Sequence, residues 1–175
     1  MLNFEDISLI PRVISEIESR DEIDISTKNF KCPIIASPMK DVCDGNVAHK
    51  MRELGGLGII HRFSTIEKQI EEYKKSLNSP CAIGINGDFY ERFQALKNEG
   101  CDLFCIDVAN GASTRVKKTL EKLDSKFIVG NVASKECYQW LDQIPNVLGI
   151  RVSIASGAAC TTKNATGIFN GTASC

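Results

Sequence analysis

Cys160 is followed directly by two hydroxyl residues, Thr161 and Thr162, in the stretch RVSIASGAACTTKNATG that spans residues 151–167. A cysteine attacks as its thiolate, and neighbouring hydroxyl groups can position a leaving group or a water molecule. The small residues before Cys160 would let a ligand come close. The chain has eight cysteines, so a small core residue is the competing interpretation. From this stretch alone, nucleophile and core residue are evenly balanced.

A second polar cluster covers residues 107–113, Asp-Val-Ala-Asn-Gly-Ala-Ser. It places the carboxylate of Asp107 at the end of an apolar run, then an Asn-Gly turn, then Ser113 as a helix N-cap. Such a pattern makes a good turn between a strand and a helix without any function. Its position relative to the other polar residues favours a functional role for Asp107.

The elements that must position these residues are short apolar runs, which alternate with longer polar stretches of helical period. We expect strands at residues 34–37, 57–60, 81–85, 103–108, 127–130 and 147–154. We expect helices at 46–54, 64–77, 88–99, 113–123 and 134–141, the second opening on a capping box between Ser64 and Glu67. Residues 161–175 lack helical periodicity, and we expect no helix there.

The strands are apolar throughout, which predicts parallel strands covered on both faces in an α/β fold. A doubly wound sheet and a (β/α)8 barrel both satisfy this pattern. Polar residues at successive strand ends favour the barrel, because its strand ends converge on one mouth; these residues are Ser37, His61, Asn86, Asp107, Asn110, Asn131 and Ser153. We therefore expect an incomplete TIM barrel of about six strands that lacks the last two.

We expect one partial barrel domain over residues 1–175. Residues 1–30 would form an N-terminal extension that packs on the barrel, and residues 161–175 a tail of the catalytic loop. The Gly55–Gly58 stretch lacks the third glycine of a dinucleotide fingerprint and precedes a strand, so we do not expect a Rossmann fold.

The composition and charge argue against a nucleic-acid-binding, membrane or zinc protein. A formal net charge of −1 offers no general attraction for nucleic acid or an anionic membrane. Neither a signal peptide nor a membrane span is apparent, so we expect a cytoplasmic protein. The cysteines form no C-x-x-C pair and the chain has two histidines, which argues against zinc.

Six motifs, taken together, resemble the IMP dehydrogenase and GMP reductase family. In order, they are LNFEDISLIP (2–11), PIIASPM (33–39), GGLGIIHR (55–62), IDVANGAS (106–113), GNV (130–132) and SGAACTTK (156–163). Within the family, IDVANG and CTTK followed by Thr166-Gly167 look more like GMP reductase, as does the short link from Lys75 to Cys81.

The resemblance implies that Cys160 attacks C2 of the purine of GMP and that Thr162 assists the departure of ammonia. NADPH would be the reductant, with NAD as the alternative cofactor of a dehydrogenase. Asp107, Ala109, Asn110 and Asn131 would form the cofactor-binding residues.

The resemblance also implies that Ser37, Met39, Ser156 and Gly157 line the site of the purine nucleoside monophosphate. Backbone carbonyls of Gly157 and Cys160 would bind a monovalent cation, usually potassium. The expected partner is a further copy of the chain, as in the family's tetramer, or a complementing C-terminal chain that catalysis would require.

This sequence departs from the family in the cysteine loop, where Ser153, Ala155 and Ala158 replace two glycines and a serine. Side chains at 153 and 155 disfavour positive φ angles, so we expect a distorted loop. Two alternatives to GMP reductase remain. One is the NAD-dependent oxidation of IMP, and the other is an inactive fragment or a nucleotide-binding interaction subunit.

Overall fold

The computed structural model describes residues 2–11, 14, 16–157 and 160–175. Its strands are β1 (Ile35–Ala36), β2 (Leu57–Gly58), β3 (Cys81–Ile83), β4 (Leu103–Asp107), β5 (Lys126–Val132) and β6 (Val147–Val152). Its α-helices are α1 (Gly45–Glu53), α2 (Ile66–Lys75), α3 (Phe89–Asn98), α4 (Thr114–Lys122), α5 (Lys135–Asp142) and α6 (Thr162–Thr166). Single-turn 3-10 helices occur at η1 (Phe4–Asp6), η2 (Arg20–Glu22) and η3 (Thr172–Ser174).

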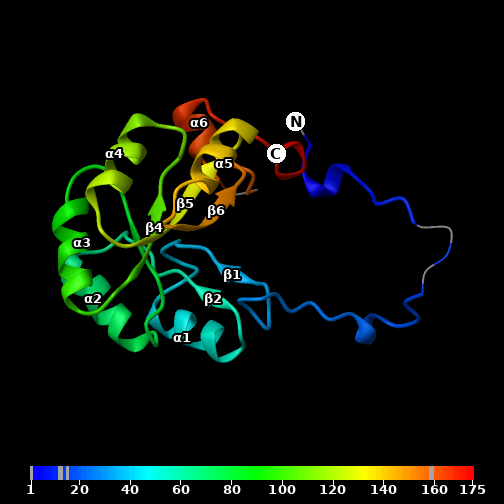
Figure 1. Cartoon of the computed structure of the whole chain (residues 1–175), viewed down its shortest axis with the longest axis horizontal. Coiled ribbons are helices and arrows are strands. Elements are labelled where there is room, and N and C mark those ends of the chain that lie inside the picture. Colours follow the sequence, from blue (N-terminus) through cyan, green and yellow to red (C-terminus); the bar gives the residue numbers. More distant parts are fainter. Residues whose placement is uncertain (1, 12–13, 15, 158–159) are drawn as a thin grey trace.

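The strands follow one another in space in the order in which they occur in the chain. β1 pairs with β2, and β3, β4, β5 and β6 form a second sheet, with every pair parallel. A parallel bridge between Ile60 and Cys81 joins the two sheets. A doubly wound sheet would reverse its strand order at a switch point, which the described strands do not do. The expected six-stranded, barrel-like α/β fold is confirmed, with α1–α5 outside the strands (Figure 1).

Local capping explains where the helices begin. Ser113 and Ser134 cap α4 and α5 through hydrogen bonds from the amides of Val116 and Cys137, as serine commonly does. The expected cap at Ser64 is wrong. The hydroxyl of Thr65 accepts the Lys68 amide at 3.2 Å, so α2 begins one residue later and the capping box with Glu67 does not form.

Two helices end as their glycines predict, and one helix was not expected. Gly55 and Gly100 follow α1 and α3 with φ of 83° and 96°, values that glycine adopts without strain. The expectation that residues 161–175 contain no helix is wrong, because Thr162–Thr166 form α6, which ends at Gly167 with φ of 70°. A single turn is too short to show a helical period in the sequence.

The side chains of the central strands divide between two apolar layers. Phe93 of α3 packs against Phe104 of β4, with ring centroids 4.7 Å apart, in the larger layer between strands and helices. The smaller layer contains no helix residue and lies on the other face of the strands; it consists of Leu57, Ile59, Ala82, Cys105 and Ile128, with Phe30 and Leu103 against it. Because alternate strand residues face opposite sides, Asp107 shares the inner face with Cys105.

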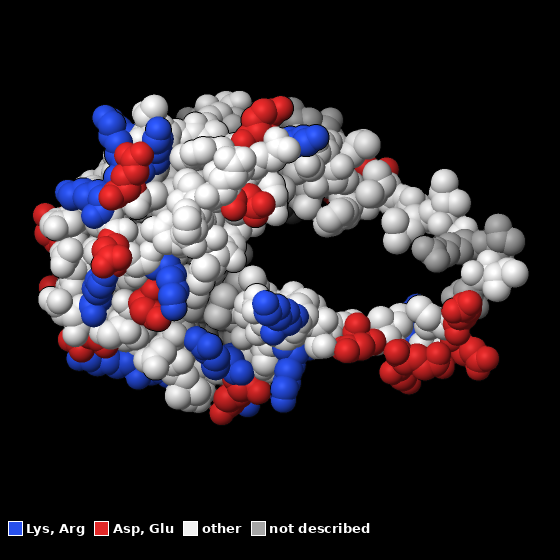
Figure 2. Space-filling view, viewed as in Figure 1, with Lys and Arg blue, Asp and Glu red and all other residues white. Residues whose placement is uncertain are grey.

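The N-terminal extension differs from the expectation that it packs on the barrel. All its described residues from 4 to 29 are exposed, and the segment leaves the body as a wide loop (Figure 1). Figure 2 shows acidic side chains gathered along it; these are Glu16, Glu18, Asp21, Glu22 and Asp24. At its start, the Leu2 carbonyl accepts the Ala173 amide at 3.0 Å, which ties the two ends of the chain together.

No helix in the described residues is long and apolar enough to cross a membrane.

Candidate active site

An ion pair lies inside the mouth of the half-barrel, at the carboxyl ends of the strands. Nη1 of Arg151 on β6 lies 2.6 Å from Oδ1 of Asp107 on β4. β5 runs between them and places Gly130 opposite both residues. A Cβ on Gly130 would lie 2.6 Å from the Cβ of Arg151, so only glycine leaves room for the arginine to reach across.

Arg62 is the second cation of this mouth. Its Nη2 donates to the Asp107 carbonyl at 3.3 Å, and its Nε lies 3.8 Å from Asp107 Oδ2. Burial opposes the charge of Arg151, yet the facing Cys105 thiol and Asp107 carboxylate outweigh it and raise the pKa of Arg151. The sequence pattern predicts a role for Asp107 but none for Arg62 or Arg151. Arg151 lies inside the apolar run VLGIRV, and an arginine within a buried strand usually has a charged partner. This position could therefore have indicated a functional ion pair.

Asn131 and the turn beside Asp107 form one interlocked rim. The Asn131 carbonyl accepts the Gly111 amide at 2.7 Å, and its amide donates to Val108 at 2.8 Å. The side-chain Oδ1 of Asn131 is buried and has no hydrogen-bond partner among the residues that the structure describes. A buried acceptor left unpaired costs free energy, so this atom suits a ligand that supplies a donor.

The neighbouring positions Ala109 and Asn110 lie half-buried in the same turn. Asn110 uses its side-chain oxygen within that turn, where it accepts the Ala112 amide at 2.9 Å. Asn110 therefore shapes the rim in the structure, as asparagine does in many turns.

The structure places Thr162 against Cys160. The hydroxyl and the backbone amide of Thr162 hydrogen-bond to the thiol, and together they lower the pKa of Cys160. Burial has the opposite effect on other thiols, raising the pKa of Cys43 to about 11 and that of Cys105 to about 12. Cys160 is also partly exposed. It thus combines the thiolate character and the access that a nucleophile needs.

The loop before Cys160 keeps a glycine-like backbone without the glycines. Ser153 and Ala155 have φ of 94° and 57°. The expected restriction by their side chains does not prevent these angles, although each costs of order 1–3 kcal/mol in strain. The Ile154 carbonyl accepts the Asn170 amide at 3.0 Å, and the Ser153 hydroxyl contacts that of Ser156 at 2.5 Å. Ala158, the third substituted position, lies outside the described residues.

Gly157 is expected both at the substrate and at a monovalent cation. Its carbonyl accepts the Cys160 amide at 2.9 Å. A carbonyl has a second lone pair, so this bond leaves room for the expected cation. No group of three or more His, Cys, Asp or Glu side chains that could hold a metal occurs in the described part of the chain.

Ser37 and Met39 lie elsewhere on the rim, just after β1. The Ser37 carbonyl accepts the Met39 amide at 2.8 Å, and the Met39 side chain is exposed. Among the described residues, no hydrogen bond or ion pair joins either of them to the cysteine loop. The structure thus joins Asp107 to Arg151 and Cys160 to Thr162, and leaves the Ser37 side of the expected site separate.

An open cavity of about 330 Å³ adjoins the cysteine loop. Ser156 and Gly157 line it together with Ala155. The two loop residues expected at the substrate therefore do border a concave site, as ligand-binding residues commonly do.

Comparison with known proteins places this geometry in a family. The model of the IMP dehydrogenase / GMP reductase domain matches residues 1–174. The GMP reductase of Bacillus subtilis is 30% identical and the inosine-5′-monophosphate dehydrogenase of Cryptosporidium parvum is also 30% identical, over 98% and 95% of this chain. The chain covers 56% and 54% of these proteins, so it spans about half the length of the curated relatives it matches.

A solved structure agrees with the sequence comparisons. The crystal structure of inosine 5′-monophosphate dehydrogenase from Legionella pneumophila superimposes with a TM-score of 0.80 and 30% identity, over 97% of this chain and 56% of the other. The chain belongs to the IMP dehydrogenase / GMP reductase family, a family of oxidoreductases.

Proposed function

We propose that this chain carries the nucleophile of a GMP reductase, which converts GMP to IMP by NADPH-dependent reductive deamination. The observation that carries the proposal is the contact of Thr162 with the Cys160 thiol and the lowered pKa that results. Several relatives named GMP reductase support it, among them those of Bacillus subtilis and Chromobacterium violaceum.

The proposed chemistry uses Cys160 as a nucleophile that later leaves. Its thiolate forms a bond to C2 of the purine of GMP, and the exocyclic amino group departs as ammonia after it gains a proton. Thr162 hydrogen-bonds to the sulfur, and we assign to its hydroxyl the transfer of that proton to the amino group. When the carbon–sulfur bond breaks, the thiolate is restored, which suits a soft nucleophile of lowered pKa.

NADPH supplies the hydride that reduces C2 when it is bound. The rim fits such a cofactor, because Asn131 Oδ1 is a buried acceptor without a partner in the described part of the chain and Arg151 holds the Asp107 carboxylate in place. We assign to Asp107 and Asn131 the binding of its nicotinamide end. A potassium ion at the Gly157 and Cys160 carbonyls is part of the same proposal.

The second candidate is the oxidation of IMP with NAD, in which water would hydrolyse the adduct on Cys160. The similarity to the dehydrogenases of Cryptosporidium parvum and Legionella pneumophila favours it. The two reactions share the nucleophile and differ in substrate and cofactor, so they are separable by assay.

A first prediction concerns both reactions. The chain is assayed alone and together with the part of the Bacillus subtilis GMP reductase that it does not match. We expect GMP-dependent oxidation of NADPH, and we expect Cys160→Ala to abolish it, while Cys32→Ala, at another partly exposed thiol, leaves it unchanged. IMP-dependent reduction of NAD in its place would show the dehydrogenase. If Cys160→Ala retains the activity of the wild type, Cys160 is not the nucleophile.

A further inference from the structure

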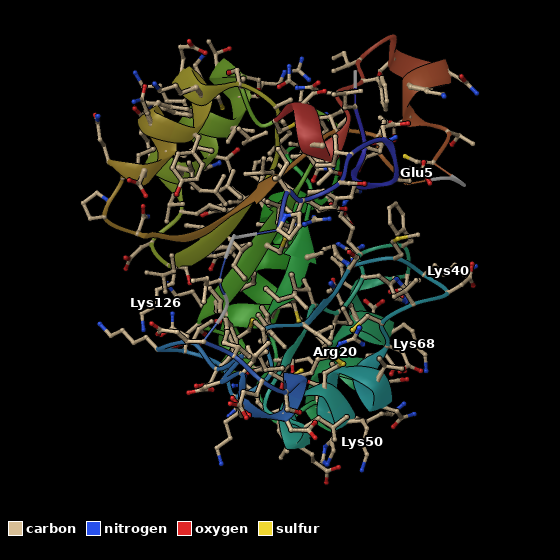
Figure 3. All side chains as sticks on the ribbon, turned by 90° about the vertical axis from the view of Figure 1, so that its right-hand side faces the viewer. Glu5, Arg20, Lys40, Lys50, Lys68 and Lys126 are labelled. Carbon is tan, nitrogen blue, oxygen red and sulfur yellow. The ribbon has the colours of Figure 1, made fainter. Side chains whose placement is uncertain are left out.

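The first described residues of the chain lie apart from the rest of the N-terminal extension. Figure 3 shows Glu5 well separated from Arg20, which belongs to the same extension. We call residues 2–5 the strap. Leu2 and Phe4 of the strap are 50% and 68% exposed, so burial of apolar surface contributes little to its placement. Its placement depends on hydrogen bonds instead.

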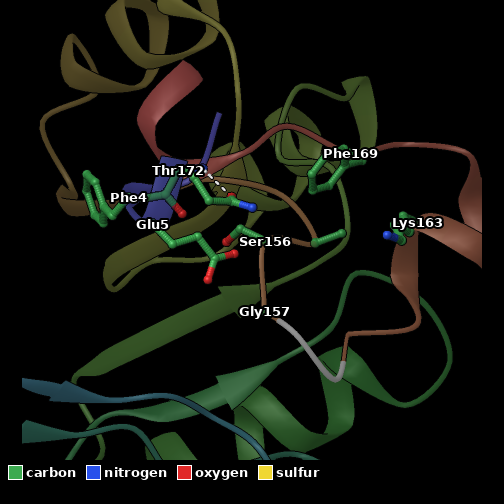
Figure 4. A pocket seen from close by; sticks show the side chains of 9 residues that line it. Phe4, Glu5, Ser156, Gly157, Lys163, Phe169 and Thr172 are labelled. Carbon is green, nitrogen blue, oxygen red and sulfur yellow. Dashed lines mark hydrogen bonds between the residues drawn. The ribbon is translucent and has the colours of Figure 1, made fainter. Parts of the chain in front are cut away.

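The strap is hydrogen-bonded to the end of the tail. The Leu2 carbonyl accepts the Ala173 amide at 3.0 Å, and the Leu2 amide donates to the Ser174 hydroxyl at 2.5 Å. The Asn3 side chain accepts the Thr172 amide at 3.3 Å, beside the open cavity described above (Figure 4). These bonds join the two ends of the described chain.

Gly171 shows how closely the strap fits. A Cβ on this residue would lie 2.4 Å from the Leu2 carbonyl oxygen and 2.9 Å from Asn3 Oδ1, and both distances are too short for a real contact. The backbone of Gly171 has φ of −65° and ψ of 148°, angles that any residue adopts. The strap, and not the backbone conformation, therefore requires a glycine here.

On its other side, the same part of the tail is bonded to the cysteine loop. The Ile154 carbonyl accepts the Asn170 amide at 3.0 Å, and the Thr172 hydroxyl donates to that of Ser153 at 3.4 Å. The Asn170 side chain donates to the Ala133 carbonyl at 3.2 Å, just after β5. The end of the tail therefore lies between the strap and the strained part of the loop.

The tail also carries Thr162, the residue that contacts the thiol. Its helix α6 is capped by Gly167, three positions before Asn170. Lys163 Nζ lies 5.4 Å from the ring centroid of Phe169, a cation–π contact that joins the helix to the segment after it. A shift of the end of the tail would therefore reach α6 and the hydrogen bonds on the thiol.

We propose that the strap positions the nucleophile, with Asn3 as its positioning residue. By fixing residues 170–174, the strap keeps the cysteine loop in its strained conformation and Thr162 against Cys160. Asn3 acts through the Thr172 amide that it accepts. The inference rests on the proposed function, since that function makes Cys160 the nucleophile.

The first test removes the acceptor of Asn3 and keeps its size. Alkylation of Cys160 by iodoacetamide is followed in the 175-residue chain across a pH series, by mass spectrometry of the Cys160 peptide. We expect Asn3→Leu to shift the profile to higher pH and to slow the reaction near pH 7 at least threefold, because Thr162 is no longer held against the thiol.

The conservative variant restores the acceptor. Asn3→Asp retains a side-chain oxygen at the same position and caps a helix as well as asparagine does, so it should keep the wild-type rate within about twofold. If the Asn3→Asp profile moves as far as that of Asn3→Leu, the acceptor is not what matters and the assignment of Asn3 is overturned.

The second test acts from the tail. Gly171→Ala should displace the Leu2 carbonyl and shift the Cys160 profile in the same direction as Asn3→Leu. Gly149→Ala is the matched control, since a Cβ there would lie 3.6 Å from the Ile128 side chain, which is an ordinary contact. An unchanged profile in Gly171→Ala, or an equal shift in Gly149→Ala, would overturn the inference.

A double variant tests the route through Thr162. If the strap acts through this residue, Asn3→Leu should shift the profile less in a Thr162→Val background than in the wild type. Equal shifts in the two backgrounds would show that the strap and Thr162 act independently, which contradicts the inference.

The same samples contain an internal reference. Cys32 is another partly exposed thiol, and its alkylation should not change in Asn3→Leu or Gly171→Ala. Parallel changes at Cys32 and Cys160 would reveal a general loss of structure and would count against the strap.

Alkylation needs neither GMP nor NADPH, so the outcomes separate this inference from the proposed function. A shifted profile in Asn3→Leu, when the wild type does not reduce GMP, supports the strap and refutes the reductase. Reduction of GMP together with an unchanged profile in Asn3→Leu supports the reductase and refutes the strap.

Discussion

Thr162 distinguishes Cys160 from the other thiols whose pKa is shifted in this chain. Burial raises the pKa of Cys43, Cys81, Cys105 and Cys137, whereas the hydroxyl and amide of Thr162 lower that of Cys160. Since alkylating reagents react with thiolates, Cys160 should be modified first. A nucleotide bound in front of it should slow that reaction.

The next prediction isolates the hydroxyl. Thr162→Val removes one of the two hydrogen bonds to the thiol, so the pKa of Cys160 should rise and its alkylation by iodoacetamide near pH 7 should slow several-fold. Thr161→Val, one residue earlier and exposed, is the matched control and should not change the rate. Mass spectrometry of the Cys160 peptide across a pH series gives the measurement. An unchanged profile in Thr162→Val would remove the threonine from the proposed mechanism.

The sequence predicts contacts between residues that are close along the chain. It does not predict contacts between residues that are far apart in the chain. Cys160 and Thr162 are two positions apart, so the motif itself places them together. Arg151 reaches Asp107 only because Gly130 lies between them, which requires the strand register. Ser64 and Thr65 are adjacent residues that can both cap a helix, so the sequence alone does not decide which of them caps α2.

At the scale of elements, Glu72 fixes how α1 and α2 meet. Its carboxylate accepts the amide of Gly45 at the start of α1 at 3.0 Å and pairs with Lys75 at 2.9 Å. Burial alone would raise the pKa of Glu72, but these bonds, with that of Lys68, lower it from 4.5 to about 2. The carboxylate also lies at the positive end of the α1 dipole.

A pH dependence of stability follows. Because the folded pKa lies below the unfolded value, the contribution of Glu72 is complete above about pH 4.5 and is lost as the pH falls towards 2. The shift corresponds to about 3 kcal/mol. Urea unfolding should show Glu72→Gln much less stable than the wild type at pH 7, with the gap closing near pH 2. Glu71→Gln, on the exposed side of α2, should show little effect at either pH; a gap that does not vary with pH would refute the role of the charge.

At the scale of the molecule, the described strands leave two open edges. Neither β1 nor β6 has a second neighbour in the sheet, and Ile35, Leu148 and Val152 on these strands are 47%, 59% and 46% exposed. The extension adds Leu9 and Ile10, each 93% exposed. Open edges and apolar surface of this kind favour association with a further chain.

The corresponding prediction is that the chain does not remain a monomer. Light scattering after gel filtration should give a mass above that of one chain. The double variant Leu148→Lys, Val152→Lys places charges along β6, and its mass should fall towards that of one chain. Lys122→Ala on the far side of α4 serves as a surface control. A stable, monodisperse wild-type monomer would contradict the expectation that the edges require a partner.

The positive φ angles of Ser153 and Ala155 bear on which substitutions the cysteine loop tolerates during evolution. The loop keeps its shape without the residues that adopt that shape at no cost, so the shape is imposed from outside, chiefly by Asn170 and Thr172 behind it. The tail residues Asn170 and Thr172 therefore hold the cysteine loop in its conformation through hydrogen bonds to Ile154 and Ser153. Substitutions within the loop are therefore tolerated while Asn170 and Thr172 stay in place, whereas a change at Asn170 that moves its backbone would remove its hydrogen bonds to Ile154 and Ser153.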